Sequence, residues 1–218
     1  MEMEYMGAFF DARVDGYEEH MMQYVDGADW YYEVTAQMLP LRPGMKLLDL
    51  GCGTGLELEA IFRLMPQAEV TGIDLSAKML ERLKAKFPDR TLTLRQGSYF
   101  DLPLGEGAFD AVVSVQSLHH FAPERKRGLF ERIRRALRPG GFFVLTDFVA
   151  PDDATEAQAF AEYAALNDQE PGVYHFDTPL TAEHDMALMV QAGLAGPALR
   201  WREKNTAVMT AKRGNEDT

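Results

Sequence analysis

The sequence contains a single cysteine, Cys52, among its 218 residues. One thiol excludes an intramolecular disulfide, and a chain without disulfides is typical of a reducing compartment. The sequence also lacks an apolar run near the roughly 20 residues that cross a bilayer, and its first residues are acidic where a secretory signal is basic. We therefore expect a cytoplasmic protein with no membrane partner.

Basic residues are also scarce. The chain has 22 Lys and Arg residues against 34 Asp and Glu residues, which gives a formal net charge of -12. Binding to a phosphate backbone depends on clustered cations that displace counterions, so nucleic acid is a poor candidate for a partner. The basic cluster between Arg125 and Arg135 is more typical of the solvated face of a helix. The sequence does not indicate the oligomeric state.

Short apolar runs alternate with longer helical patterns between Lys46 and Asp147. This alternation is typical of a parallel sheet that helices cover on both faces. We expect strands at residues 46–50, 69–73, 91–95, 111–115 and 141–147, and helices at residues 55–65, 76–86 and 124–137. Ser76 is expected to cap the second helix, and Pro139-Gly140-Gly141 to terminate the third.

The flanking segments differ in composition from this central part. Residues 1–45 crowd aromatic and Met side chains into expected helices, which form either a lid or part of the core, the core being the more typical place for such stripes. Residues 150–180 form an insertion with a helix near residues 155–167 and a breaker at Pro171-Gly172. Insertions at the carboxyl ends of strands commonly shape substrate pockets.

A last helix at residues 181–192 is expected to lead into strands at residues 197–202 and 205–211, followed by a tail at residues 214–218. The short turn between these strands favours an antiparallel hairpin at the edge of the sheet. The expected fold is α/β: a doubly wound, mostly parallel seven-stranded sheet with a C-terminal antiparallel hairpin. Residues 1–45 would form a helical N-terminal cover over a domain spanning residues 46–213, with the insertion at about residues 150–180.

Three glycines, Gly51, Gly53 and Gly55, follow the first expected strand. Glycines there let a ligand approach the backbone, and the next helix begins with amides that suit a carboxylate or phosphate. Asp74 closes the second expected strand, where a carboxylate can accept hydrogen bonds from ribose hydroxyls. A pyrophosphate fingerprint would place its third glycine where Leu56 stands, which makes a nicotinamide or flavin cofactor a weaker alternative.

The run Asp49–Gly55, the acid Asp74 and the run Leu137-Arg138-Pro139-Gly140-Gly141 together resemble class I S-adenosyl-L-methionine-dependent methyltransferases of the small-molecule type. The resemblance implies that adenosylmethionine is the cofactor, that Gly51 and Gly53 face its methionine part and that Asp74 holds its ribose. The cofactor contacts that it implies are Asp49, Gly51, Gly53, Asp74, Leu75, Met79, Ser98, Tyr99 and Gln116. Ser98 stands where many members have Asp. Leu75 and Met79 have an alternative interpretation as ordinary core residues, and Ser98 as a turn residue.

Methyl transfer from a sulfonium is an in-line displacement, in which a base is optional. His119 and His120 follow the fourth expected strand and are the candidates for accepting a proton, although the resemblance does not require them to be catalytic. Tyr17, Tyr174 and His175 are candidates for the substrate pocket. The histidines lack a compact ligand spacing, so no metal site is expected.

The expected acceptor is a small molecule. Methylation at a pyrimidine ring carbon commonly uses a nucleophilic thiolate, and the only thiol, Cys52, belongs to the glycine turn. The Asn-Pro-Pro-Tyr type of motif for amino-group methylation of adenine or glutamine is absent after the fourth expected strand. Two alternatives stay open: a non-catalytic adenosylmethionine-binding protein, and an enzyme that transfers a modified alkyl group from a related cofactor.

Overall fold

The structure is a computed structural model that describes residues 4–166 and 174–215. Within these residues a seven-stranded sheet has the strand order β3-β2-β1-β4-β5-β7-β6. The strands are β1 (Lys46–Leu50), β2 (Glu69–Asp74), β3 (Leu92–Gln96), β4 (Phe109–Val115), β5 (Leu137–Phe148), β6 (Leu194–Glu203) and β7 (Thr206–Arg213). Strands β1 to β5 pair in parallel, whereas β7 pairs antiparallel with both β5 and β6. The expected fold class is therefore confirmed.

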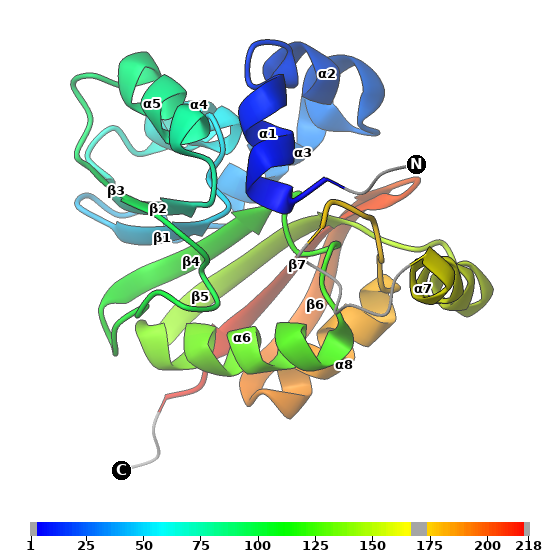
Figure 1. Ribbon diagram of the computed structural model, residues 1–218. Coiled ribbons are helices and arrows are strands. Elements are labelled where there is room, and N and C mark those ends of the chain that lie inside the picture. Colours follow the sequence, from blue (N-terminus) through cyan, green and yellow to red (C-terminus); the bar gives the residue numbers. More distant parts are fainter. Residues whose placement is uncertain (1–3, 167–173, 216–218) are drawn as a thin grey trace.

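Helices cover both faces of this sheet, because successive side chains of each central strand are buried on opposite sides. Leu47 belongs to one buried cluster and Leu48 to the other, and neither is exposed to solvent. Figure 1 shows α4 and α5 on one face and α6 and α8 on the other. The helices are α1 (Met6–Arg13), α2 (Tyr17–Tyr24), α3 (Ala28–Gln37), α4 (Leu56–Leu64), α5 (Ala77–Lys86), α6 (Pro123–Ala136), α7 (Asp153–Leu166) and α8 (Ala182–Gln191).

The N-terminal helices divide between two tasks. Helix α3 is part of the core, since Tyr31 and Ala36 are fully buried in the cluster that includes Leu47. The hydroxyl of Thr35 meets that of Thr146 in β5 at 2.5 Å, which fixes α3 to the sheet. Helix α1 contacts α5 near the carboxyl ends of the strands (Figure 1). The first two helices therefore lie where ligands bind in this class of fold.

One expectation about local structure is wrong. Pro139-Gly140-Gly141 does not terminate the third expected helix, because α6 already ends at Ala136. Leu137 adopts extended backbone and pairs with Phe109, so the chain enters β5 directly. Gly140 then adopts a φ of 73°, next to a shift in the register between β4 and β5. The Pro-Gly-Gly run thus forms an irregularity within a long strand.

The remaining expectations concern the insertion, the caps and the tail. Ser76 caps α5 as expected, its Oγ accepting a hydrogen bond from the Met79 amide at 3.1 Å. Asn167 and the breaker Pro171-Gly172 lie outside the described residues, as do the last three residues of the tail. Within the described part of the chain, every helix is too short or too polar to span a bilayer.

Candidate active site

The glycine turn after β1 and the carboxylate of Asp74 form one hydrogen-bonded unit. The Gly53 amide donates to Oδ2 of Asp74 and the Ser76 amide donates to Oδ1, each at 2.8 Å. Gly51 has a φ of +77°, and a Cβ there would approach the Ser117 hydroxyl to 2.2 Å, so only glycine fits. The backbone itself therefore fixes the acid beside the turn.

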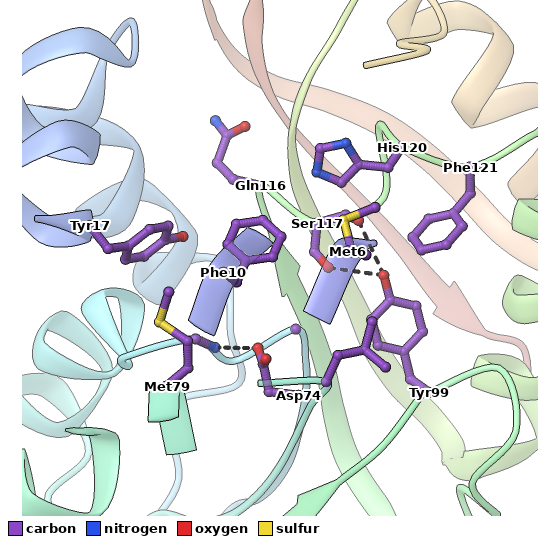
Figure 2. Close-up of a pocket in the computed structure, with 13 residues that line it drawn as sticks. Met6, Phe10, Tyr17, Asp74, Met79, Tyr99, Gln116, Ser117, His120 and Phe121 are labelled. Carbon is purple, nitrogen blue, oxygen red and sulfur yellow. Dashed lines mark hydrogen bonds between the residues drawn. The ribbon is translucent and has the colours of Figure 1, made fainter. Parts of the chain in front are cut away.

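A cavity lies against this unit (Figure 2). Most of the expected cofactor contacts line it, namely Gly51, Gly53, Asp74, Leu75, Met79, Tyr99 and Gln116. Tyr99 is held in place because its hydroxyl lies 2.9 Å from the Ser117 hydroxyl and 3.1 Å from the Ser117 carbonyl oxygen. Gln116 has a positive φ of 50°, which is uncommon for a residue other than glycine and is typical of functional sites.

Two expected contacts behave differently. The hydroxyl of Ser98 accepts a hydrogen bond from the Phe100 amide at 3.1 Å, which is the turn role that the sequence left open. Asp49, in β1 just before the glycine turn, is fully buried. Among the described residues neither of its carboxylate oxygens accepts a hydrogen bond from an amide or a cation, and the group that interacts with it is the carboxyl of Glu57. A buried carboxylate of this kind is stable only when a proton or a nearby cation neutralises its charge.

Sequence reasoning missed the neighbour of Asp49, which is Glu57 in the first turn of α4. Glu57 is buried, and its Oε1 also lacks a hydrogen-bond partner among the described residues. Burial raises the pKa of Glu57 to about 7, and burial together with repulsion from Glu57 also raises the pKa of Asp49. A buried pair of carboxylates needs a proton or a nearby positive charge to be stable. The ammonium group of an amino acid would supply that charge.

The N-terminal helices cover part of the cofactor cavity. Met6 and Phe10 of α1 and Tyr17 of α2 form part of its wall. Asp11 holds α1 in place, since its carboxylate accepts a hydrogen bond from the Ser76 hydroxyl. The volume that remains is about 50 Å³, whereas cofactor sites need at least about 300 Å³. The cover must therefore move for a cofactor to enter.

A second and larger cavity, of about 610 Å³, adjoins the first. The two share four lining residues, Phe10, Tyr17, Gln116 and His120. Its other lining residues are Phe9, Arg13, Gly16, His20, Met21, Tyr24, Val25, Asp26, His119, Phe148, His175, Asp177 and Thr206. We call this the acceptor cavity, because it meets the cofactor cavity and has the size of a small-molecule site.

His119, which lines the acceptor cavity, is oriented by a buried carboxylate. Its Nδ1 lies 2.6 Å from Oδ1 of Asp147, and the same carboxylate accepts hydrogen bonds from the Leu118 and Phe148 amides. Burial opposes the charged imidazole, yet the pKa of His119 is raised, because Asp147 and Asp177 favour its protonation. Asp147 thus fixes the ring through Nδ1, so Nε2 is the nitrogen that a ligand in the cavity can contact.

His120, His175 and Asp177 surround His119. Oδ1 of Asp177 lies 3.1 Å from Nδ1 of His120 and 3.7 Å from Nε2 of His119. Burial and the charge of neighbouring imidazoles lower the pKa of His120, and they lower that of His175 to about 4. Burial opposes ionisation of Asp177, but its histidine partners hold its pKa below the ordinary value.

The expected pocket residues divide between the cavity and its cover. Tyr17 lines both cavities, and His175 lines the acceptor cavity with its ring stacked on Phe9 at 3.5 Å. Tyr174 instead stacks on Tyr5, with ring centroids 4.7 Å apart, and forms an isolated bridge with it. Nothing in the residue pattern predicts this contact, which joins the N-terminal segment to the end of the insertion.

Comparison with known proteins identifies the family. A family model described as a methyltransferase domain matches residues 48–145. An uncharacterized methyltransferase of Synechocystis sp. is 32% identical over 163 residues, which cover 75% of each chain. The 27-O-demethylrifamycin SV methyltransferase of Amycolatopsis mediterranei is 38% identical over 58% of this chain and 47% of its own, so the chain spans about half of that relative.

A solved structure agrees in fold. An O-methyltransferase family protein from Burkholderia thailandensis superposes with a TM-score of 0.73 at 17% identity, over 96% of this chain and 63% of its own. The glycine turn, Asp74 and the buried carboxylates lie within the part of the chain that the methyltransferase model matches. The chain belongs to the class I S-adenosylmethionine-dependent methyltransferases.

Proposed function

We propose that this enzyme methylates a hydroxyl or amine of a small molecule that binds in the acceptor cavity. The observation that carries the proposal is the junction of the two cavities at Phe10, Tyr17, Gln116 and His120. A molecule in the larger cavity can thereby meet the methyl donor without passing through bulk solvent. The name of the rifamycin relative specifies an oxygen acceptor on a small molecule. The name of a demethylmenaquinone methyltransferase from Symbiobacterium thermophilum, 34% identical over 155 residues, agrees with a small-molecule acceptor without specifying the atom.

The residues of this chain divide the work between donor and acceptor. Asp74 would hold the ribose, and Asp49 with Glu57 the ammonium group, of adenosylmethionine. The bound sulfonium supplies an activated methyl group. As the new bond to the acceptor forms and the carbon–sulfur bond breaks, the acceptor loses one proton, and Nε2 of His119 is the group placed to accept it. The apolar walls, Phe9, Phe10 and Phe148 among them, exclude water.

Two finer points of the proposal rest on composition. The net charge of -12 disfavours a nucleic-acid acceptor. The single buried thiol, Cys52, suits a cytoplasmic protein.

The proposal is tested first at the donor side, by the increase in melting temperature that adenosylmethionine causes. Asp74→Asn should remove most of this increase, because a lost hydrogen bond to a charged acceptor costs about 1.5–3 kcal/mol of binding. Asp89→Asn, an exposed acid after α5, is the matched control. Formation of adenosylhomocysteine with a panel of phenols, alcohols and amines then tests the acceptor side. No shift at saturating cofactor, or no turnover across the panel, would contradict the proposal.

A further inference from the structure

Two histidines and one carboxylate converge at the inner end of the acceptor cavity. His119 and His120 follow β4, whereas Asp177 lies after the insertion, and the potential ligand atoms of all three lie within 4.8 Å of one another. The absence of a compact spacing along the chain indicated no metal site, but the fold brings these distant residues together. We propose that this cluster binds one divalent transition-metal ion, which holds an oxygen of the acceptor.

The distances fit one ion. Metal–nitrogen and metal–oxygen bonds of about 2.0–2.2 Å place two ligand atoms of a tetrahedral ion about 3.3 Å apart. The distances from Oδ1 of Asp177 are 3.1 Å to His120 Nδ1 and 3.7 Å to His119 Nε2, one slightly shorter and one slightly longer. Nδ1 of His120 also lies 3.2 Å from the Phe176 carbonyl oxygen, so an ion bound at this nitrogen would take the place of that contact. Two imidazoles and one carboxylate form a ligand set that zinc and iron(II) accept.

The groups behind the cluster have the arrangement that metal-binding histidines need. A ligating histidine usually donates its second ring N–H to a carboxylate, which fixes the ring and its tautomer. His119 has this partner in Asp147, at 2.6 Å from Nδ1. Asp147 is fully buried and is itself held by two backbone amides. Nε2 of His119 is thus the nitrogen left for a metal.

The ligand-bearing segments are fixed to each other by the backbone. The Thr178 amide donates to the His119 carbonyl oxygen at 2.8 Å, which places Asp177 beside the histidines. The Ala150 amide donates to the Leu180 carbonyl oxygen at 2.9 Å and secures the far side of the same segment. Such support keeps the ligands near the geometry that an ion requires.

Charge also favours a dication. With neutral imidazoles, Asp147 and Asp177 contribute two negative charges to this part of the cavity. The two cations nearby already have acidic partners, because Lys126 pairs with Asp185 at 2.6 Å and Arg13 with Glu4 at 2.7 Å. A divalent ion would balance the two negative charges. Three protein ligands leave at least one coordination position open, and all three residues line the acceptor cavity, so an acceptor oxygen can reach that position. Only the identity of the acceptor rests on the proposed function.

The ion and a proton would compete for Nε2 of His119. In the metal-free protein this nitrogen can accept the proton of the acceptor. In the metal form, the ion lowers the pKa of the hydroxyl bound to it, so that the proton leaves to solvent before the oxygen attacks the methyl group. The acceptor class is therefore an oxygen nucleophile that ionises on a metal, such as a phenol or an enol.

Cobalt(II) is the probe for the test, because its visible absorption reports the ligands directly. The full chain, stripped with a chelator, should bind one Co²⁺ with an absorption band that Zn²⁺ removes. His120→Ala and Asp177→Asn should abolish the band, and Asp147→Asn should weaken binding about 10- to 100-fold through His119. His184→Ala is the control, since His184 also pairs with a carboxylate, Glu156, but on the surface.

Retention of the adenosylmethionine-induced melting shift shows that each variant is folded. The proposal is overturned if the wild-type chain has no saturable band, or if the band survives in His120→Ala and Asp177→Asn. Methyl transfer by a chain that binds no Co²⁺ would refute the metal site and leave the proposed function intact. A Co²⁺ site in a chain that methylates no acceptor would refute the proposed function and leave the metal site intact.

Discussion

The donor half and the acceptor half of the site are built by different means. The donor half consists of backbone turns at the ends of β1 and β2, where Gly53 and Ser76 hold Asp74 through their amides. The acceptor half consists of side chains from three distant segments, and its central contact joins Asp177 to His119 and His120. The first half can therefore stay constant while substitutions in the second change which molecule is methylated.

The largest expected effect is on turnover, and it comes from His119 in the acceptor half. His119→Ala should lower turnover by at least about 100-fold, because it removes the group that acts on the proton of the acceptor. The increase in melting temperature with adenosylmethionine should stay, whereas Asp74→Asn loses it. Asp147→Asn leaves the His119 ring in place but removes the carboxylate that orients it. The turnover of this variant should therefore lie between those of wild type and His119→Ala. Loss of the cofactor-induced shift in His119→Ala would show that the halves are not separable.

A pH effect of up to about 3 kcal/mol is expected in the donor half, from Glu57. The pKa of its carboxyl rises on folding from 4.5 to about 7, so the folded chain binds more protons than the unfolded chain between these values. The free energy of unfolding should therefore fall as the pH rises from 4.5 through 7. Glu57→Gln should reduce the slope of this dependence in urea titrations and leave the part that the raised pKa of Asp49 contributes, whereas Glu59→Gln, exposed on the same helix, should retain the full slope. Parallel profiles for wild type and Glu57→Gln would contradict this interpretation.

A smaller effect tests how tightly the backbone of the donor half is packed. Gly51 and Gly44 both have positive φ, but a Cβ at Gly51 meets the Ser117 hydroxyl whereas a Cβ at Gly44 meets nothing within 4 Å. Gly51→Ala should therefore destabilise the chain by about 1–3 kcal/mol more than Gly44→Ala does. Midpoints of urea unfolding measure the difference. Equal midpoints would mean that Ser117 moves aside at little cost.

The sequence predicted that Gly51, Gly53 and Asp74 lie together because the information for this is local. Gly51 and Gly53 directly follow an apolar strand, and Asp74 ends the next one, so the parallel sheet places them at one edge. Ser76 shows its role as a cap from its position alone. Glu57 escaped notice because its burial depends on how α3 and α4 pack, whereas an acid in the first turn of a helix usually has an ordinary electrostatic role.

The acceptor half was less predictable because its contacts join segments far apart in the chain. His119 and His120 were identified from their place after β4, but their partner Asp177 looked like part of a helix cap. Phe10 gave no sign that it would cover a cofactor cavity, since a phenylalanine in a helix is usually core. The positions of Asp177 and Phe10 depend on packing between segments that are far apart in the chain, which the sequence pattern does not show.

Helix α1 has a consequence for the timing of the reaction. Phe10 lines both cavities, and Asp11 fastens the same helix to Ser76 beside the donor site. A movement of α1 would therefore change the shape of both cavities together. Motions of such covers take microseconds to milliseconds and limit turnover in many enzymes. A strong hydrogen bond between the Ser76 hydroxyl and the Asp11 carboxylate would then slow each cycle even when methyl transfer itself is fast.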